Sequence, residues 1–276
     1  GVWFAKGGTN KLIAGMVRQF ERIGGTIRLD DPVVAIEVSG ERARAVRTRS
    51  GWRGEADAVA SNGDVVHSYG LIEGSERGPR QVKAMKRKSF SPSLFVLHFG
   101  LEGTFDIPHH TILFGPRFKG LIGEIYKGGT LATDPALYIH HPTITDPTMA
   151  PPGCSTFYAL APVPHMGKHK IDWDKDGDAY ADVVLDVLAE RLIPDIRERM
   201  KVQFHYAPSD FGRDLNAHLG SAFSLEPVLW QSAWFRTHNR DDKIRNLFFV
   251  GAGTHPGAGI PGVVGSAEAT AGLMLA

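Results

Sequence analysis

Apolar side chains in the first part of the chain repeat at helical spacing and then at every second position. Six of them share one helical face between Thr9 and Ile23, and Gly24 follows, so the pattern predicts a helix with Thr9 or Asn10 as its N-cap. The alternation beyond it predicts four short strands. They lie at residues 26–29, at 34–38, after the turn at 39–41 through Val46, and at 56–60. One amphipathic helix followed by a hairpin is therefore expected.

The middle of the chain predicts mostly strands. Their apolar patterns lie at residues 94–101, 111–114, 136–140, 156–161 and 202–207. Two helices are expected between them, around residues 118–125 and from Ala179 to about Leu192. Because several strands follow one another without regular helices, an antiparallel or mixed sheet is predicted. Residues 211–236 are rich in Phe and Trp, which a packed core explains better than a ligand cavity.

The last thirty or so residues predict a strand at 247–250, a glycine-rich turn and a helix of small residues from near Gly262. This order suits an anionic cofactor. Glycines lack the Cβ atoms that would keep a ligand away from the backbone, and the free N–H groups at a helix start favour negative charge. A glycine-rich turn without any ligand stays open as the simpler reading.

The same turn contains a match to the dinucleotide-binding pattern G-x-G-x-x-G, at Gly257, Gly259 and Gly262. That pattern must follow a strand directly and open a βαβ unit, with an acidic residue about 20 positions further on. Here only fourteen residues follow Gly262. We therefore reject a dinucleotide fingerprint at this position.

Composition narrows the class of protein. The 276 residues suffice for one large domain or two modest ones, and 31 Lys and Arg nearly balance 30 Asp and Glu, so nothing indicates nucleic acid binding. The single cysteine, Cys154, excludes an internal disulfide and fits a reducing compartment. No apolar run has the length of a membrane-spanning helix.

Motifs for metal binding are present but weak, and no metal site is predicted. Asp172, Asp174, Asp176 and Gly177 copy the opening of a calcium-binding loop, but Val183 stands where a bidentate carboxylate is required. The acidic residues are better explained as the lead-in to the helix from Ala179.

The histidines give no stronger metal signal. His165 and His169 have helical spacing, but Pro164 and Gly167 argue against a helix. In extended strands the members of the pairs 109–110 and 140–141 would point their side chains in opposite directions.

Nucleophilic chemistry is weaker still. Ser221 has His218 and His255 as possible bases, but the sequence shows no G-x-S-x-G elbow and no placed acid.

Taken whole, the chain resembles the phytoene desaturase family of FAD-dependent oxidoreductases. The resemblance is carried above all by GAGTHPGAGIPGV and GSAEATAGLML near the end, and further by GGTNKLIAGM, ADAVASNGD, SLFVLHFGL, FYALAPVPHMG and GSAFSLEPVLWQSAWFR. It implies an α/β (α+β) fold, an incomplete two-domain flavoprotein of the amine-oxidase and desaturase superfamily. Residues 1–78 and 237–276 would belong to the FAD-binding domain, and 79–236 to the substrate-binding domain.

The resemblance also implies cofactor contacts. The N–H groups at Gly262 and Val263 would face the flavin, the backbone at Val33 would bind adenine, and Gly251, Ala252 and Gly253 would lie beside the cofactor. Ala252 stands where many relatives have an acidic residue for the ribityl chain, so a backbone group would have to replace it. No catalytic acid or base is predicted; His255 and Pro256 are weak candidates for shaping the reaction slot.

The implied activity is desaturation of phytoene or a related long isoprenoid polyene, with hydride passing to FAD. The family's N-terminal fingerprint segment does not precede Gly1, so the chain is expected to bind FAD weakly and to be inactive alone. The implied location is cytoplasmic and peripheral to a membrane, and the basic run from Lys83 to Lys88 is a possible lipid contact. Alternatives are a carotenoid isomerase, a carotenoid oxygenating enzyme, an amine oxidase, or a non-catalytic module for apolar ligand or membrane.

Overall fold

The computed structural model describes residues 3–128, 131–168 and 170–276. The chain divides into two compact units. The first unit consists of Gly1–Arg28, Leu94–Pro164 and Lys168–Ala207, and the second of Leu29–Ser93, His165–Gly167 and Pro208–Ala276. Each unit is built from segments that are far apart in the sequence.

The first unit is built on a five-stranded sheet in the order β10-β6-β9-β8-β7. Its strands are β6 (Ser93–Glu102), β7 (His110–Leu113), β8 (Leu137–His140), β9 (Cys154–Val163) and β10 (Met200–Tyr206). Its helices are α1 (Thr9–Arg22), α4 (Phe118–Lys127), α5 (Trp173–Arg191) and two 3-10 turns, Pro142–Ile144 and Pro147–Met149. The pairings β10·β6, β7·β8 and β8·β9 are antiparallel, which agrees with the prediction of an antiparallel or mixed sheet.

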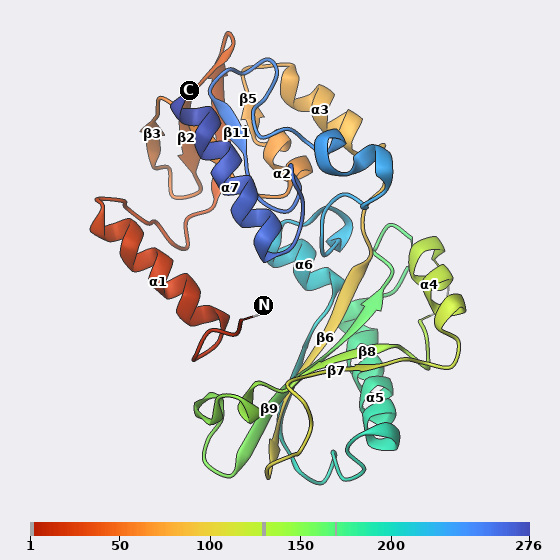
Figure 1. The fold of residues 1–276 in the computed structure, drawn as a ribbon. Coiled ribbons are helices and arrows are strands. Elements are labelled where there is room, and N and C mark those ends of the chain that lie inside the picture. Colours follow the sequence, from red (N-terminus) through yellow and green to blue (C-terminus); the bar gives the residue numbers. More distant parts are fainter. Residues whose placement is uncertain (1–2, 129–130, 169) are drawn as a thin grey trace. The chain divides into compact units, whose positions relative to one another are not determined.

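The two faces of this sheet differ. Burial alternates residue by residue along β6 and β9. The side chains on one face of each strand are therefore buried in a core, and those on the other face are half-exposed. The buried face, with Phe95, Leu97 and Phe157 among its members, packs on apolar residues of α5 such as Leu188. Figure 1 shows α5 running along the sheet.

The second unit contains two small sheets. One has the order β3-β2-β1-β5 and the other pairs β11 with β4 in parallel. The strands are β1 (Val33–Ser39), β2 (Arg42–Thr48), β3 (Arg53–Glu55), β4 (Val59–Ser61), β5 (Ile72–Glu73) and β11 (Leu247–Phe249). The helices are α2 (Val65–Gly70), α3 (Arg77–Met85), α6 (Pro208–Leu215), α7 (Ile260–Leu275) and the 3-10 turns His218–Gly220, Leu229–Gln231 and Ala233–Phe235. Ile36, Tyr69 and Phe249 lie in the shared core.

Several boundaries differ from the sequence prediction. Residues 26–29 form no strand, and Ile27 and Leu29 stay 39% and 79% exposed because neither a neighbouring strand nor a core covers them. Gly8, not Thr9 or Asn10, is the N-cap of α1, and no side chain caps it. Helix α5 begins at Trp173, six residues before the predicted start, since Trp173 is buried against Phe95 at a ring distance of 5.7 Å.

The domain boundaries expected after residues 78 and 236 remain predictions. The division by contacts instead places 29–93 together with 208–276 and puts α1 with the five-stranded sheet. Within the described part of the chain, none of the helices combines the length and apolarity needed to span a bilayer.

Candidate functional site

The loop between β11 and α7, residues 250–259, is the closing loop. Of the glycines predicted as cofactor contacts, Gly251 and Gly253 lie in this loop, and Gly262 lies in the first turn of α7. A Cβ atom on Gly251 would lie 2.4 Å from Asn62 Oδ1, and one on Gly253 would lie 2.5 Å from Val65 Cγ2. A Cβ on Gly262 would lie 2.6 Å from the carbonyl oxygen of Gly257. All three glycines are thus required by contacts with the protein itself, whatever ligand binds beside them.

The start of α7 has backbone N–H groups without a hydrogen-bond partner among the described residues. Val263 N–H donates to the Gly259 carbonyl at 2.8 Å, which is the first bond of the helix. Pro261 has no N–H, so Ile260 and Gly262 supply the donors of the first turn. Gly259 itself has φ +91°, and apart from its chain neighbours no described residue comes within 4 Å of an added Cβ. Of the two predicted flavin contacts, Gly262 has the free donor and Val263 uses its own inside the helix.

Arg236 binds the closing loop through hydrogen bonds to the Ala252 carbonyl. Its side chain is 4% exposed and donates to the carbonyls of Ala252 (Nη2, 2.7 Å), Phe223 (Nη2, 2.9 Å) and Leu225 (Nη1, 3.2 Å). Burial lowers the pKa of Arg236 from its ordinary value. The Ala252 carbonyl is therefore already engaged. Of the two backbone groups of Ala252, the N–H is the one without a hydrogen-bond partner among the described residues, so it is the group that could take the role expected here.

A buried polar network joins β11, the closing loop and α7. Asn239 Nδ2 lies 3.0 Å from both Ser266 Oγ and Thr270 Oγ1, and 3.1 Å from the His255 carbonyl. Ser266 Oγ accepts from Gly251 N–H at 3.1 Å. These contacts fix the spacing of loop and helix, and they occupy the Gly251 N–H.

Asp241, which precedes β11, accepts hydrogen bonds from Arg77 of α3. Burial alone would raise the pKa of Asp241, but hydrogen bonds from Arg77, from the N–H groups of Ile244 and Lys243 and from Tyr69 outweigh it and hold the pKa below its ordinary value. The charged carboxylate is thus the form that the fold stabilises.

We expect stability from Asp241 to be present above about pH 4, the pKa of an unfolded aspartate, and to be lost as the pH falls through the lowered pKa. Urea unfolding at pH 6 and pH 3 measures this loss. Asp241→Asn should unfold more easily at pH 6 and show a smaller difference between the two pH values. An equal pH difference in both proteins would contradict the assignment.

The remaining predicted contacts lie in the same unit. Val33 opens β1 and is 38% exposed; β1 pairs with β5 only at Ile36 and Glu37, so the backbone before Ile36 has no strand neighbour on that edge among the described residues. His255 and Pro256 form a cis peptide bond in the closing loop. His255 Nδ1 is buried without a hydrogen-bond partner in the described structure.

A pocket of about 620 Å³ lies beside the closing loop and the later turns of α7. Its lining includes Trp234, Asn239, His255, Ala269 and Leu273, but none of the predicted cofactor glycines. Trp234 and Leu273 are exposed apolar side chains, at 68% and 41%. The pocket and the start of α7 are therefore different surfaces of the second unit.

The weak nucleophile hypothesis gains no support. Ser221 Oγ is buried and makes no hydrogen bond with a described residue, so neither His218 nor His255 is placed as its base. Asp174 and Asp176 lie in the first turn of α5, where their charge complements the helix start and where no calcium loop can form. His169 lies outside the described residues, so the pairing with His165 is not addressed by the structure.

The prediction for the histidine pair 109–110 is wrong. His109 precedes β7, so strand alternation does not apply to it, and its ring lies 4.5 Å from that of His110. For the pair 140–141 the prediction holds: His140 lies with His109, whereas His141 is buried against Phe157 on the other face of the sheet. The sequence pattern missed this histidine cluster, because it depends on how β7 pairs with β8.

The half-exposed face of the five-stranded sheet carries a row of aromatic side chains. His98 stacks on Phe204 with ring centres 4.8 Å apart, and Tyr158 lies 5.6 Å from His98 and 5.8 Å from Tyr138. Burial, followed by the neighbouring Tyr138, raises the pKa of Tyr158, and burial lowers the pKa of His98. At neutral pH the row is uncharged, which suits a flat or conjugated apolar ligand.

Comparison with curated proteins gives matches along the whole chain. A phytoene desaturase (lycopene-forming) from Paracoccus sp. is 59% identical over 277 residues, covering 100% of this chain and 55% of the relative. The corresponding enzyme of Pseudescherichia vulneris is 52% identical, with 100% and 56% covered. The chain belongs to the phytoene desaturase family. A neurosporene-forming phytoene desaturase of Cereibacter sphaeroides, 44% identical, covers 99% of the chain.

This member of the phytoene desaturase family spans about half the length of the curated relatives it matches. No family model matches the chain. Among solved structures, an oxidoreductase from Methanosarcina mazei matches with a TM-score of 0.66 at 16% identity, over 97% of this chain and 55% of the other. A putrescine oxidase variant matches with a TM-score of 0.61 at 17% identity, over 98% and 53%. At these identities the structures support the fold, as the sequence predicted.

Proposed function

We propose that this chain serves an FAD-dependent desaturase that introduces double bonds into phytoene or a related long isoprenoid polyene. The observation that carries the proposal is the 59% identity, along the whole chain, to a phytoene desaturase. The structure adds an uncharged aromatic row on the first unit and a helix start with free donors on the second. An apolar substrate and an anionic cofactor call for these two kinds of surface.

The second unit provides the groups that would hold FAD. The Gly262 N–H at the start of α7, the Ala252 N–H and the free edge of β1 near Val33 are all backbone groups, as the sequence comparison implied. The open surroundings of Gly259 and the unpartnered His255 Nδ1 fit a group bound against the closing loop. Bound FAD would supply the hydride acceptor, and Arg236 and Asn239 would hold the loop in place for it.

The first unit would bind the polyene. Tyr158, Tyr138 and His98 present ring faces without charge, and a conjugated chain gains contact area on such faces. Their spacing along one sheet face would align an extended substrate. No described side chain of this row is placed as a strong base, in keeping with a reaction that asks the protein mainly to position substrate and exclude water.

A peripheral contact with a membrane at the cytoplasmic side is part of the same proposal, since phytoene dissolves in lipid. Helix α1 supports it: none of its residues is buried, and Leu12, Ile13, Met16 and Phe20 are 45–60% exposed on one face. The basic residues Lys83 to Lys88 at the end of α3 are a separate candidate for contact with anionic lipid.

The substrate face can be tested in a chimera that joins this chain to the remaining part of the Paracoccus desaturase. Phe204→Glu places a charge on the aromatic row at a side chain that is 60% exposed, so folding should survive. Conversion of phytoene in liposomes should fall at least tenfold with flavin content unchanged, because charge must be desolvated to bind a polyene. Chromatography of the products measures conversion.

Gln203→Glu is the matched control. It adds the same charge to the same strand, but Gln203 pairs with Phe99, which faces the core side of the sheet. Equal losses in both variants would remove the aromatic row as the substrate face. A chimera that isomerises or oxygenates phytoene instead of desaturating it would favour the other enzyme classes, and polyene binding without any flavin would favour a binding module.

A further inference from the structure

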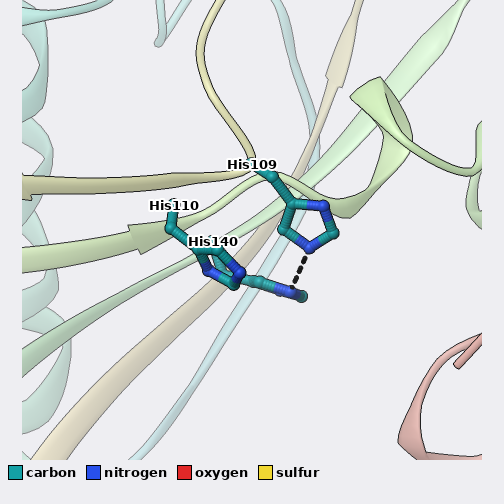
Figure 2. A group of neighbouring side chains, drawn as sticks. All are labelled: His109, His110 and His140. Carbon is teal, nitrogen blue, oxygen red and sulfur yellow. Dashed lines mark hydrogen bonds between the residues drawn. The ribbon is translucent and has the colours of Figure 1, made fainter. Parts of the chain in front are cut away.

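Three histidines of the first unit lie together at one end of β7 and β8. His110 begins β7 and is paired directly with His140 at the end of β8, so their side chains share one face of the sheet. His109, just before β7, completes the group, with ring centres 4.7 Å from His140 and 4.5 Å from His110 (Figure 2). One ring nitrogen from each histidine lies within 4.8 Å of the others.

Two of these rings are held in orientation by their other nitrogen. His109 Nδ1 lies 2.6 Å from Thr145 Oγ1, and His110 Nδ1 lies 2.7 Å from Tyr138 Oη. In both rings Nε2 is the atom left to bind something else. His109 Nε2 and His140 Nε2 are already 2.9 Å apart, as the dashed line in Figure 2 marks. Histidine ligands of metal ions are commonly oriented by such partners on the second ring nitrogen.

Two of the rings, those of His109 and His140, also favour the neutral form. Burial, together with the neighbouring histidines, lowers the pKa of His109 and lowers that of His140 to about 4. A neutral imidazole offers a lone pair to a metal ion without first losing a proton. His110 is exposed, so an ion can enter from solvent and a water molecule can occupy a further position.

We propose that His109, His110 and His140 bind one divalent transition-metal ion, of which Zn²⁺ is the natural test case. Three imidazoles with one open position form a familiar zinc-binding set, with Zn–N distances of about 2.0–2.1 Å. A tetrahedral ion of that size separates its ligands by roughly 3.3 Å, so the 2.9 Å gap between His109 and His140 needs to open by a few tenths of an ångström. Imidazole ligands favour Zn²⁺, Co²⁺, Ni²⁺ or Cu²⁺ over Mg²⁺ and Ca²⁺.

Titration of the untagged 276-residue chain with ZnCl₂, followed by calorimetry and by competition with a chromophoric chelator, tests the site. One ion per chain with micromolar or tighter affinity is expected, and Co²⁺ should show the visible absorption of a four-coordinate site. His110→Gln, at an exposed position, should weaken binding at least tenfold. Thr145→Val, which removes only the partner of His109 Nδ1, should weaken it by about 10- to 100-fold.

His98→Gln and His238→Gln are the controls, since the first lies on the same sheet face and the second in the other unit, and both lie outside the cluster. Circular dichroism confirms that each variant is folded. Absence of a one-to-one Zn²⁺ complex, or equal weakening by the control substitutions, would overturn the proposal and leave the His109–His140 contact as an ordinary hydrogen bond. The assay needs neither flavin nor polyene, so its result is independent of the proposed function.

Discussion

Gly262→Ala in the chimera with the Paracoccus desaturase should abolish retention of flavin and, with it, conversion of phytoene. The added Cβ would lie 2.6 Å from the Gly257 carbonyl oxygen and 3.1 Å from its carbon, both backbone atoms that no rotamer change can move. Relief requires a shift of the closing loop or of the first turn of α7, which supplies the free donors. Flavin absorbance after gel filtration measures the effect, and a loss of tenfold or more is expected.

Gly272→Ala is the matched control, because Gly272 lies in the same helix and an added Cβ there meets no atom within 4 Å. This substitution should leave flavin and activity unchanged and stabilise the helix by up to ~1 kcal/mol. If Gly262→Ala retains flavin as well as Gly272→Ala does, the start of α7 is not the cofactor surface.

Substitutions of Ile260 can separate the effect of a charge at the start of α7 from the effect of a change in side-chain shape. Its side chain is 59% exposed at the first position of α7, so aspartate and asparagine both fit there. An anion at this position would compete with an anionic reduced flavin for the positive end of the helix. Ile260→Asp should therefore lower the flavin reduction potential relative to Ile260→Asn. Equal potentials would contradict a flavin at this helix start.

Local patterns in the sequence were sufficient for most elements. The helix at Thr9–Arg22 and the long strands β6 and β9 follow from apolar spacing within each segment, which depends on no distant partner. The failures have a common cause. A strand at residues 26–29 needs a neighbour that the fold does not provide, and the start of α5 is set by burial of Trp173 against a strand far away in the chain.

The candidate site shows the same limit. Glycine and helix-start signals located the closing loop, but sequence alone could not show that Gly251 is required by its contact with Asn62. The histidine cluster depends on the register of His110 with His140, thirty positions apart, and a residue pattern carries no register. The sequence did offer one signal. A pair of histidines stands at the start of β7, and a second pair stands at the end of β8.

Arg236→Met should strongly destabilise the second unit, by about 3 kcal/mol or more. Methionine fills similar apolar volume but leaves the buried carbonyl of Leu225 and the partly buried carbonyls of Ala252 and Phe223 without their donors. Arg236→Lys keeps the charge with fewer donors and no planar fork, so its loss should be intermediate. Urea unfolding of the chimera, monitored by fluorescence, measures the loss of unfolding free energy in both variants.

Arg213→Met controls for the loss of an arginine as such, because Arg213 is exposed and its ion pairs with Asp210 and Asp214 lie at the surface. A cost of ~1 kcal/mol or less is expected there. Arg236→Met should also release flavin before global unfolding, since the guanidinium holds Ala252 and thereby the closing loop. Flavin loss that coincides with unfolding would instead make Arg236 a residue of the core alone, with no separate part in shaping the cofactor surface.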